Sequence, residues 1–250
     1  MIAAGAIAVM VLALTTPGMG ASSPEPAPSD LPEIGHTKST TPACAVMRDL
    51  VIPSFAAARR ADARFAVTQT RLPRYAEARA DVKNDRNTAG TDNQIVEGLQ
   101  ESLLSQIDQD AANMLGYAAF IGKALGDPRL AADSKDPDVQ EERAQLQALY
   151  AVQQSRAAAL AELAARDRVK LTTSQMGAAR IKGKMAEATV SDAASPQPFE
   201  TAAPAMPNFS GNSFADKQRM SAWTRDMAKA VADAENRAAK SFLPLAQRCR

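Results

Sequence analysis

DPDVQEERAQLQALYAVQQSRAAALAELAARDRVKLTTSQMGAARIKGKMAEATV, residues 136–190, is the stretch that decides the fold. It begins with a helix start signal, because Asp136 can cap the first turn and Pro137 suits the first helical position. No proline follows Pro137 within it, so we predict one helix over 137–190. At 1.5 Å per residue this helix would be roughly 80 Å long, so other helices must pack along it.

One face of this helix is marked by residues that follow one another at steps of three or four. The series consists of Leu146, Leu149, Gln153, Ala157, Leu160, Ala164, Asp167, Leu171, Ser174, Ala178, Ile181 and Met185. The whole chain of 250 residues is 46% hydrophobic but only 4% aromatic. Burial must therefore rely on small side chains, which favours closely packed helices over sheets.

Three further helical regions are predicted, over 42–84, 92–126 and 213–248. In the first, Pro53 and Pro73 predict a break or kink, because each lacks an amide donor and crowds the carbonyl four residues earlier. The second carries an apolar face formed by Ile95, Leu99, Leu103, Ile107, Ala111, Met114, Tyr117, Ile121 and Leu125. The last carries one formed by Met220, Trp223, Met227, Val231, Ala234, Ala238, Phe242, Leu245 and Cys249.

The ends of these helices also have local signals. Gly126 predicts a left-handed residue that ends the second helix, and Ser213 with Asp216 resembles a capping pair at the start of the last one. A strip without bulk, where another helix can approach closely, is formed by Ala118, Gly122 and Gly126.

The predicted fold is all-α: an elongated antiparallel bundle of about four helical regions with one very long helix, forming a single domain over 42–250. An even number of crossings returns the chain to its starting end. The two cysteines, Cys44 and Cys249, would then meet, and in an oxidising compartment we expect a disulfide. The alternative is two unpaired thiols.

The N-terminus predicts export. Residues 2–14 form an apolar run followed by small residues, so we assign 1–21 to a signal peptide cleaved near Gly20 or Ala21. The alternative is an uncleaved anchor, although the run is shorter than the ~20 residues that a span needs. We therefore expect a periplasmic or extracellular protein without a stable membrane span after cleavage.

Two segments rich in proline separate the predicted parts. Residues 22–41 are predicted to be a disordered lead, and 193–212 a linker. Phe199, Met206 and Phe209 of the linker are expected either to lie along the long helix or to dock a partner.

The chain lacks the residues that most catalytic and metal-binding sites require. The single histidine, His36, lies in the lead, so neither helical metal ligands nor a catalytic triad is expected. The acids of 127–138 are not in calcium-loop register, and no cofactor is predicted. A net charge of +1 gives no reason to expect nucleic acid. Glu97 and Glu101, one turn apart, are the remaining catalytic candidates, as a glycosidase pair.

These observations favour a non-enzymatic, exported helical structural or interaction protein of the bacterial cell envelope, with a protein partner. In layout the chain is similar to the minor pilin components of type IV secretion systems, which have an export signal, a helical hairpin and a very long helix. That similarity implies an alternative function in a secretion or conjugation apparatus, and it assigns no residue a role. The enzymatic alternative is a carboxylate-dependent cell-wall glycosidase.

Overall fold

The computed structural model describes residues 31–32, 34, 41–85, 91–178 and 204–250. The predicted signal peptide, the helix beyond Ala178 and the first part of the linker lie outside the described residues. Leu31 and Ile34 are buried against the helices. The packed region thus reaches back into the segment that the sequence assigns to the lead.

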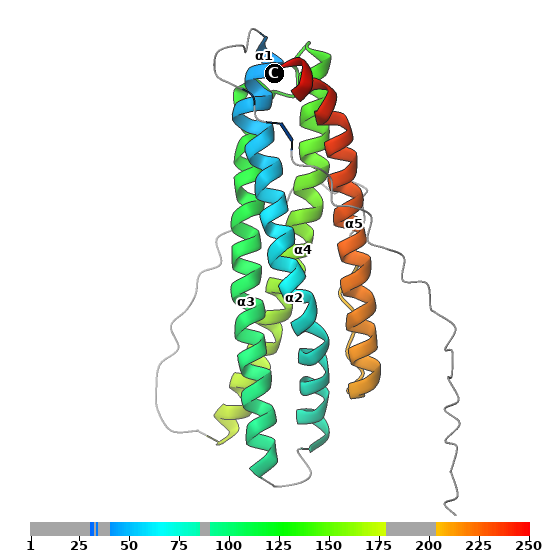
Figure 1. Ribbon diagram of the computed structural model, residues 1–250. Helices are drawn as coiled ribbons and strands as arrows, with labels where there is room; N and C mark the ends of the chain where they lie inside the picture. The colour runs from blue at the N-terminus through cyan, green and yellow to red at the C-terminus, as the bar shows by residue number, and fades with distance from the viewer. Residues whose placement is uncertain (1–30, 33, 35–40, 86–90, 179–203) are drawn as a thin grey trace, which may run out of the picture.

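Four long helices lie side by side and run alternately up and down, which confirms the predicted bundle (Figure 1). They are α2 (Ile52–Asp85), α3 (Thr91–Leu125), α4 (Pro137–Ala178) and α5 (Ser213–Arg248). Short elements precede α2 and α4: α1 (Pro42–Val46), the π-helical η1 (Met47–Val51) and the 3₁₀ turn η2 (Pro128–Leu130). The four helices have 34, 35, 42 and 36 residues, so no one of them dominates in the described part.

The bundle is four-cornered. Both α2 and α4 pack against α3 and α5, so that α2 and α4 stand diagonally opposite and run in the same direction. Two main apolar clusters fill the interior, one near the disulfide end and one further along. Each cluster contains one nearly perpendicular ring contact between α2 and α5. Phe55 packs on Phe242 in the first cluster and Phe65 on Trp223 in the second, each with centroids 6.3 Å apart.

The two prolines of the first helical region behave differently. The π-turn η1 comes just before Pro53, where the carbonyl of Asp49 lacks its usual amide partner. At Pro73, where a break or kink is predicted, the helix does not break, because α2 continues through it. Leu72 and Tyr75 on either side are fully buried, and their packing holds the helix together there.

The predicted apolar face of α3 is wrong at its start. Ile95 and Leu99 are 72% and 52% exposed, whereas Ile107 and Ala111 are fully buried. Steps of four residues rotate about 40° each around a helix, so Ile95 lies about 160° from Ala111. The buried face alternates steps of four and three, through Leu104, Ile107, Ala111, Met114, Ala118 and Ile121.

The helix ends also correct two predictions. Gly126 ends α3 without a left-handed backbone, since among the described glycines only Gly211 has a positive φ, 89°. Asn212 rather than Ser213 caps α5, accepting the amide of Ala215 at 2.9 Å. Asp216 turns back to accept the amide of Gly211 at 2.8 Å. These bonds fix the chain where it enters α5.

The strip without bulk on α3 does allow close approach. A Cβ at Gly122 would lie 3.0 Å from Cε2 of Tyr150 on α4. The Tyr150 ring therefore occupies the space that a side chain at this position would need.

Candidate functional site

The most unusual residues of the interior belong to α4. Nine of its buried positions follow one another at alternating steps of three and four, at Val139, Glu142, Leu146, Leu149, Gln153, Arg156, Leu160, Leu163 and Asp167, with Val152, Ala157 and Ala164 buried beside them. This is the heptad spacing of a coiled-coil seam. Four of these nine positions are polar or charged, and each is at most 2% exposed. The bundle therefore places charged groups where a seam normally has apolar ones.

A central polar layer surrounds Arg156. Its Nη1 donates to Oδ1 of Asp62 on α2 at 2.8 Å, and its Nη2 donates to Oε1 of Gln153. The guanidinium also lies over the ring of Phe65, 4.6 Å from the centroid. From α5, Glu235 accepts Nη1 of Arg59 at 3.2 Å. Three of the four long helices thus meet through charges in this layer.

Burial controls the ionisation of this layer. It lowers the pKa of Arg156, an effect that the negative charge of Asp62 opposes. It raises the pKa of Glu235 to about 8, assisted by the nearby charge of Asp62 and opposed by Arg59. Nε of Arg156 and Oε1 of Glu235 have no hydrogen-bond partner within the described residues.

A second polar layer is built on Asp167. Its carboxylate accepts the hydroxyl of Tyr75 at 2.5 Å and Nε of Arg79 at 2.8 Å, both from α2. Arg79 in turn lies over the ring of Phe209, 4.3 Å from its centroid. Burial raises the pKa of Tyr75, so its hydroxyl stays protonated and donates to the carboxylate. Phe209 of the linker therefore packs on the bundle. This contact favours packing of the linker on its own chain over docking of a partner.

A third buried carboxylate joins α2 to α3. Asp110 accepts the hydroxyl of Thr68 at 3.0 Å and Nη1 of Arg71 at 2.5 Å. Arg64 lies 3.7 Å from its other oxygen. Two arginines of α2 thus pair with one buried carboxylate of α3, and these ion pairs join the neighbouring helices.

Glu142 differs from these groups because it has no counter-charge. It is 2% exposed, and neither carboxyl oxygen has a hydrogen-bond partner in the described part of the chain. Burial raises its pKa to about 8, and the negative charges of Asp138 and Asp136 act in the same direction. The carboxyl is therefore held protonated at neutral pH.

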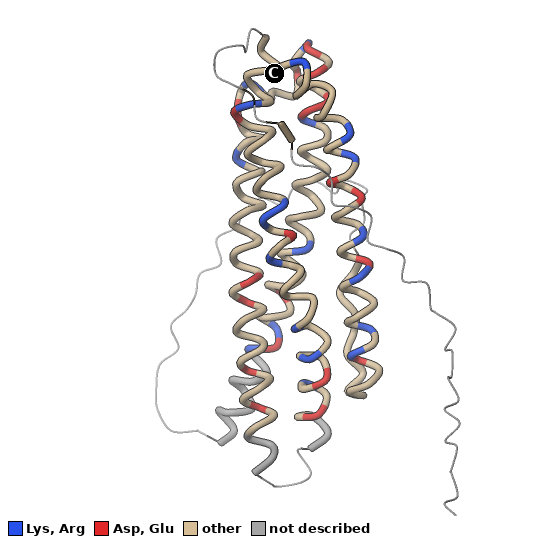
Figure 2. The backbone as a smooth tube through the Cα atoms, viewed as in Figure 1, with Lys and Arg blue, Asp and Glu red and all other residues tan. Residues whose placement is uncertain are grey.

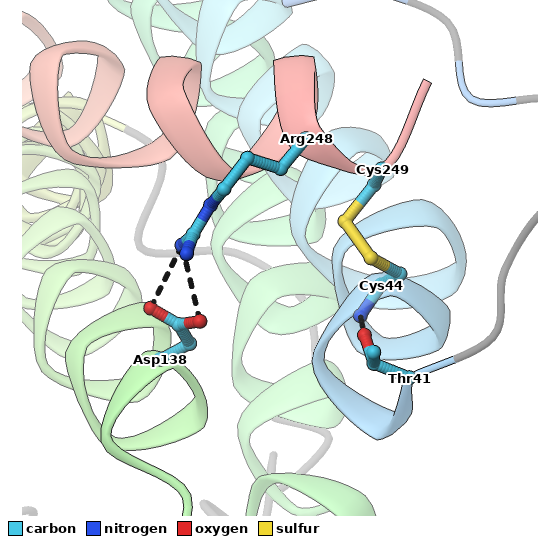
Figure 3. The surroundings of a disulfide bond; sticks show 5 residues. All are labelled: Thr41, Cys44, Asp138, Arg248 and Cys249. Carbon is cyan, nitrogen blue, oxygen red and sulfur yellow. Dashed lines mark hydrogen bonds and ion pairs between the residues drawn. A yellow bond between two sulfur atoms is a disulfide. The ribbon is translucent and has the colours of Figure 1, made fainter.

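The first and last of the described helices, α1 and α5, meet at the end of the bundle where α4 begins. Cys44 of α1 and Cys249, which follows α5, form a disulfide with their Cα atoms 5.3 Å apart (Figure 3). The hydroxyl of Thr41 accepts the amide of Cys44 at 3.2 Å and begins α1. Arg248 donates to both oxygens of Asp138, at 3.0 and 3.1 Å, and ties the end of α5 to the start of α4.

The predicted catalytic pair does not form a site of this kind. Glu97 and Glu101 are both exposed on α3, away from the buried layers. Among the described residues, no group of three or more histidine, cysteine or acidic side chains is arranged to hold a metal ion. No helix in the described ranges is long and apolar enough to cross a membrane.

No protein-family model, curated protein or solved structure matches this chain significantly. Its function must therefore be argued from its own residues. Arg156, Asp167 and Glu235 are each 1% exposed, so a dissolved substrate cannot reach them. What these layers can do is specify which helices pair and in which register.

Replacing Tyr75 with phenylalanine tests the Asp167 layer. Tyr75→Phe keeps the ring but removes the hydroxyl that Asp167 accepts, so we expect a loss of about 1.5–3 kcal/mol in the free energy of unfolding. Urea unfolding followed by circular dichroism measures this. Tyr150→Phe, whose ring packs on Gly122, is the matched control and should change stability by less than about 0.5 kcal/mol. Equal losses for the two variants would contradict a special role for the Asp167 layer.

Proposed function

We propose that this protein is a non-enzymatic, exported structural or interaction protein of the bacterial cell envelope. The observation that carries the proposal is the disulfide between Cys44 and Cys249, which closes nearly the whole described chain into one loop. Structural disulfides persist in oxidising compartments and are rare in the cytosol. The apolar run at 2–14 supports the same compartment from the sequence side.

The arrangement of charges supports a structural rather than a catalytic role. Polar side chains converge in the interior of the bundle, where they join helices and are closed to substrates. A rigid rod with exposed helix faces along its length suits attachment to another protein.

The location is tested by expressing the full-length chain in a bacterium and separating cytoplasm, periplasm and medium. We expect the mature protein outside the cytoplasm, beginning near Ala21 by N-terminal sequencing, with no thiol available to a maleimide reagent. Cys44→Ser is the matched control for labelling, because it leaves Cys249 as one reactive thiol. Full-length, fully labelled protein in the cytoplasm would refute the proposed compartment.

The enzymatic alternative is tested by incubating the purified protein with peptidoglycan. We expect no release of soluble fragments above that from a Glu97→Gln, Glu101→Gln double variant. Release by the wild-type protein alone would replace the structural proposal with a glycosidase.

A further inference from the structure

The exposed face of α3 carries no charge along most of its length. Between residues 102 and 120 its exposed positions hold only serine, glutamine, asparagine, alanine, glycine and one aromatic, Phe120. The interval contains two acids, and neither is an unpaired charge on this face: Asp110 is buried, and Asp108 pairs with Arg168 of α4. We call this exposed face, residues 102–120, the neutral stripe. At 1.5 Å per residue it is about 28 Å long.

The outward face of α5 is different. α5 exposes Arg225, Asp226, Lys229, Asp233 and Arg237 in successive turns. In Figure 2, α5 alternates blue and red, whereas most of α3 is tan. A solvated helix face in a protein with 23% charged residues is expected to resemble α5. The centres of interfaces, in contrast, are depleted of charge and enriched in aromatic residues.

Opposite charges flank the neutral stripe. Glu101 precedes it and Lys123 follows it, both exposed, and neither forms an ion pair among the described residues. Ala112 lies midway between them. If a second α3 lies antiparallel on the first, with the two-fold axis at Ala112, each Glu101 meets Lys123 of the second copy. A parallel pairing would bring like charges together at both ends, which is unfavourable.

We propose that the neutral stripe is the site at which a second copy of this chain docks, with the two α3 helices antiparallel. The charge pattern favours a second copy because a two-fold interface requires a surface complementary to itself. The small side chain of Ala112 lets the helices approach closely at the axis. Phe120, 49% exposed, falls over the small residues around Ser102 and Ser105 of the second copy. The inference deepens the proposed interaction function by naming the partner.

The test is sedimentation equilibrium of the mature, disulfide-bonded protein over a concentration series. One helix face buries less than the about 1,200 Å² of a stable complex, so we expect a reversible dimer with a dissociation constant in the micromolar range. Lys123→Glu and Glu101→Lys should each weaken it about tenfold or more, because two attractive pairs become repulsive. The double variant restores opposite charges and should return to within about threefold of wild type.

The matched control is Lys229→Glu, which makes the same charge change on exposed α5 and should leave the dimer unaffected. Gly116→Glu and Gly98→Glu form a second matched pair, since a Cβ at either glycine meets nothing within 4 Å. Only Gly116 lies in the neutral stripe, so only its variant should dissociate the dimer. Circular dichroism confirms that each variant remains folded.

A wild-type protein that stays monomeric over the whole series would overturn the proposal, as would a dimer that either single charge reversal leaves unchanged. Failure of the double variant to recover would refute the antiparallel register. None of these results bears on export or on the oxidised cysteines. The envelope location stands or falls separately, by the fractionation experiment.

Discussion

Reducing the disulfide will lower the free energy of unfolding by about 3–5 kcal/mol. Cys44 and Cys249 are separated by 205 residues, so their bond removes a large part of the conformational freedom of the unfolded chain. The chain-entropy model gives about 5 kcal/mol for a loop of this length, and measured values usually fall below it. At about 2–4 °C per kcal/mol for a chain of this size, the midpoint of thermal unfolding should fall by roughly 10 °C.

Calorimetry with and without a reductant measures the effect. The Cys44→Ala, Cys249→Ala double variant should unfold at the temperature of the reduced protein and should not respond to reductant. Arg248→Ala is a matched control at the same end of the bundle. Its ion pair with Asp138 is exposed, so the loss should be below about 1 kcal/mol. An unfolding midpoint that reduction leaves unchanged would contradict the view that the disulfide restrains the unfolded chain.

The disulfide and the antiparallel topology were predictable together because both follow from counting helices. The positions of Cys44 and Cys249 at the two ends of the helical region required an even number of crossings, and four is what the structure has. Alanine-rich periodicity and the Asp136–Pro137 start likewise sufficed to place the start of α4, where the side chain of Asp136 accepts the amide of Asp138. Periodicity and caps are local properties, so sequence alone can reveal them.

Errors arose where local rules compete with packing. A proline normally breaks a helix, but at Pro73 the buried neighbours Leu72 and Tyr75 hold α2 together. At the start of α3, hydrophobicity alone suggested that Ile95 and Leu99 face inward, although their spacing carries them around the helix. Asn212 caps α5 rather than Ser213, and local rules do not separate the two because both residue types are good helix caps.

The buried charges were only half predictable. Gln153 and Asp167 belong to the predicted face of α4, whereas Arg156 and Glu142 do not, because the predicted series runs through Ala157 and begins at Leu146. A strict alternation of three and four along α4 would have included both. Their partners were not predictable, because Asp62 and Glu235 lie far away in sequence and only the packed bundle brings them together.

Raising the pH from 5 to 9 will destabilise the protein through Glu142. This carboxyl occupies a seam position between Val139 and Leu146, and within the described residues it has no hydrogen bond. Its pKa in the folded protein is about 8, well above the 4.5 of an unperturbed glutamate. The protein therefore folds around the protonated acid. Keeping it neutral costs nothing below pH 4.5, where the unfolded chain is protonated too.

The stability associated with Glu142 is fully present below pH 4.5 and is lost as the pH rises through about 8. Between these values the unfolded chain loses its proton and the folded chain keeps it, so ionisation favours unfolding. The complete loss is roughly 4–5 kcal/mol at 1.36 kcal/mol per pKa unit, and about 2–4 kcal/mol is expected if the bundle relaxes or admits water. Glu235, whose pKa is also about 8, adds to the same trend.

Glu142→Gln removes the titration while keeping the shape, and Glu142→Leu continues the apolar seam. We expect Glu142→Leu to stabilise the protein by about 2–4 kcal/mol at pH 9 and to flatten the pH dependence, measured as urea unfolding at pH 5, 7 and 9. Glu142→Gln should flatten it in the same way, with a smaller gain because the buried amide still needs partners. The matched control is Glu141→Gln, one residue away but exposed, which should leave the pH dependence unchanged. If the wild-type protein were equally stable at pH 5 and 9, Glu142 would have to be ionised and solvated in the folded state, and the apolar environment assigned to it would be wrong.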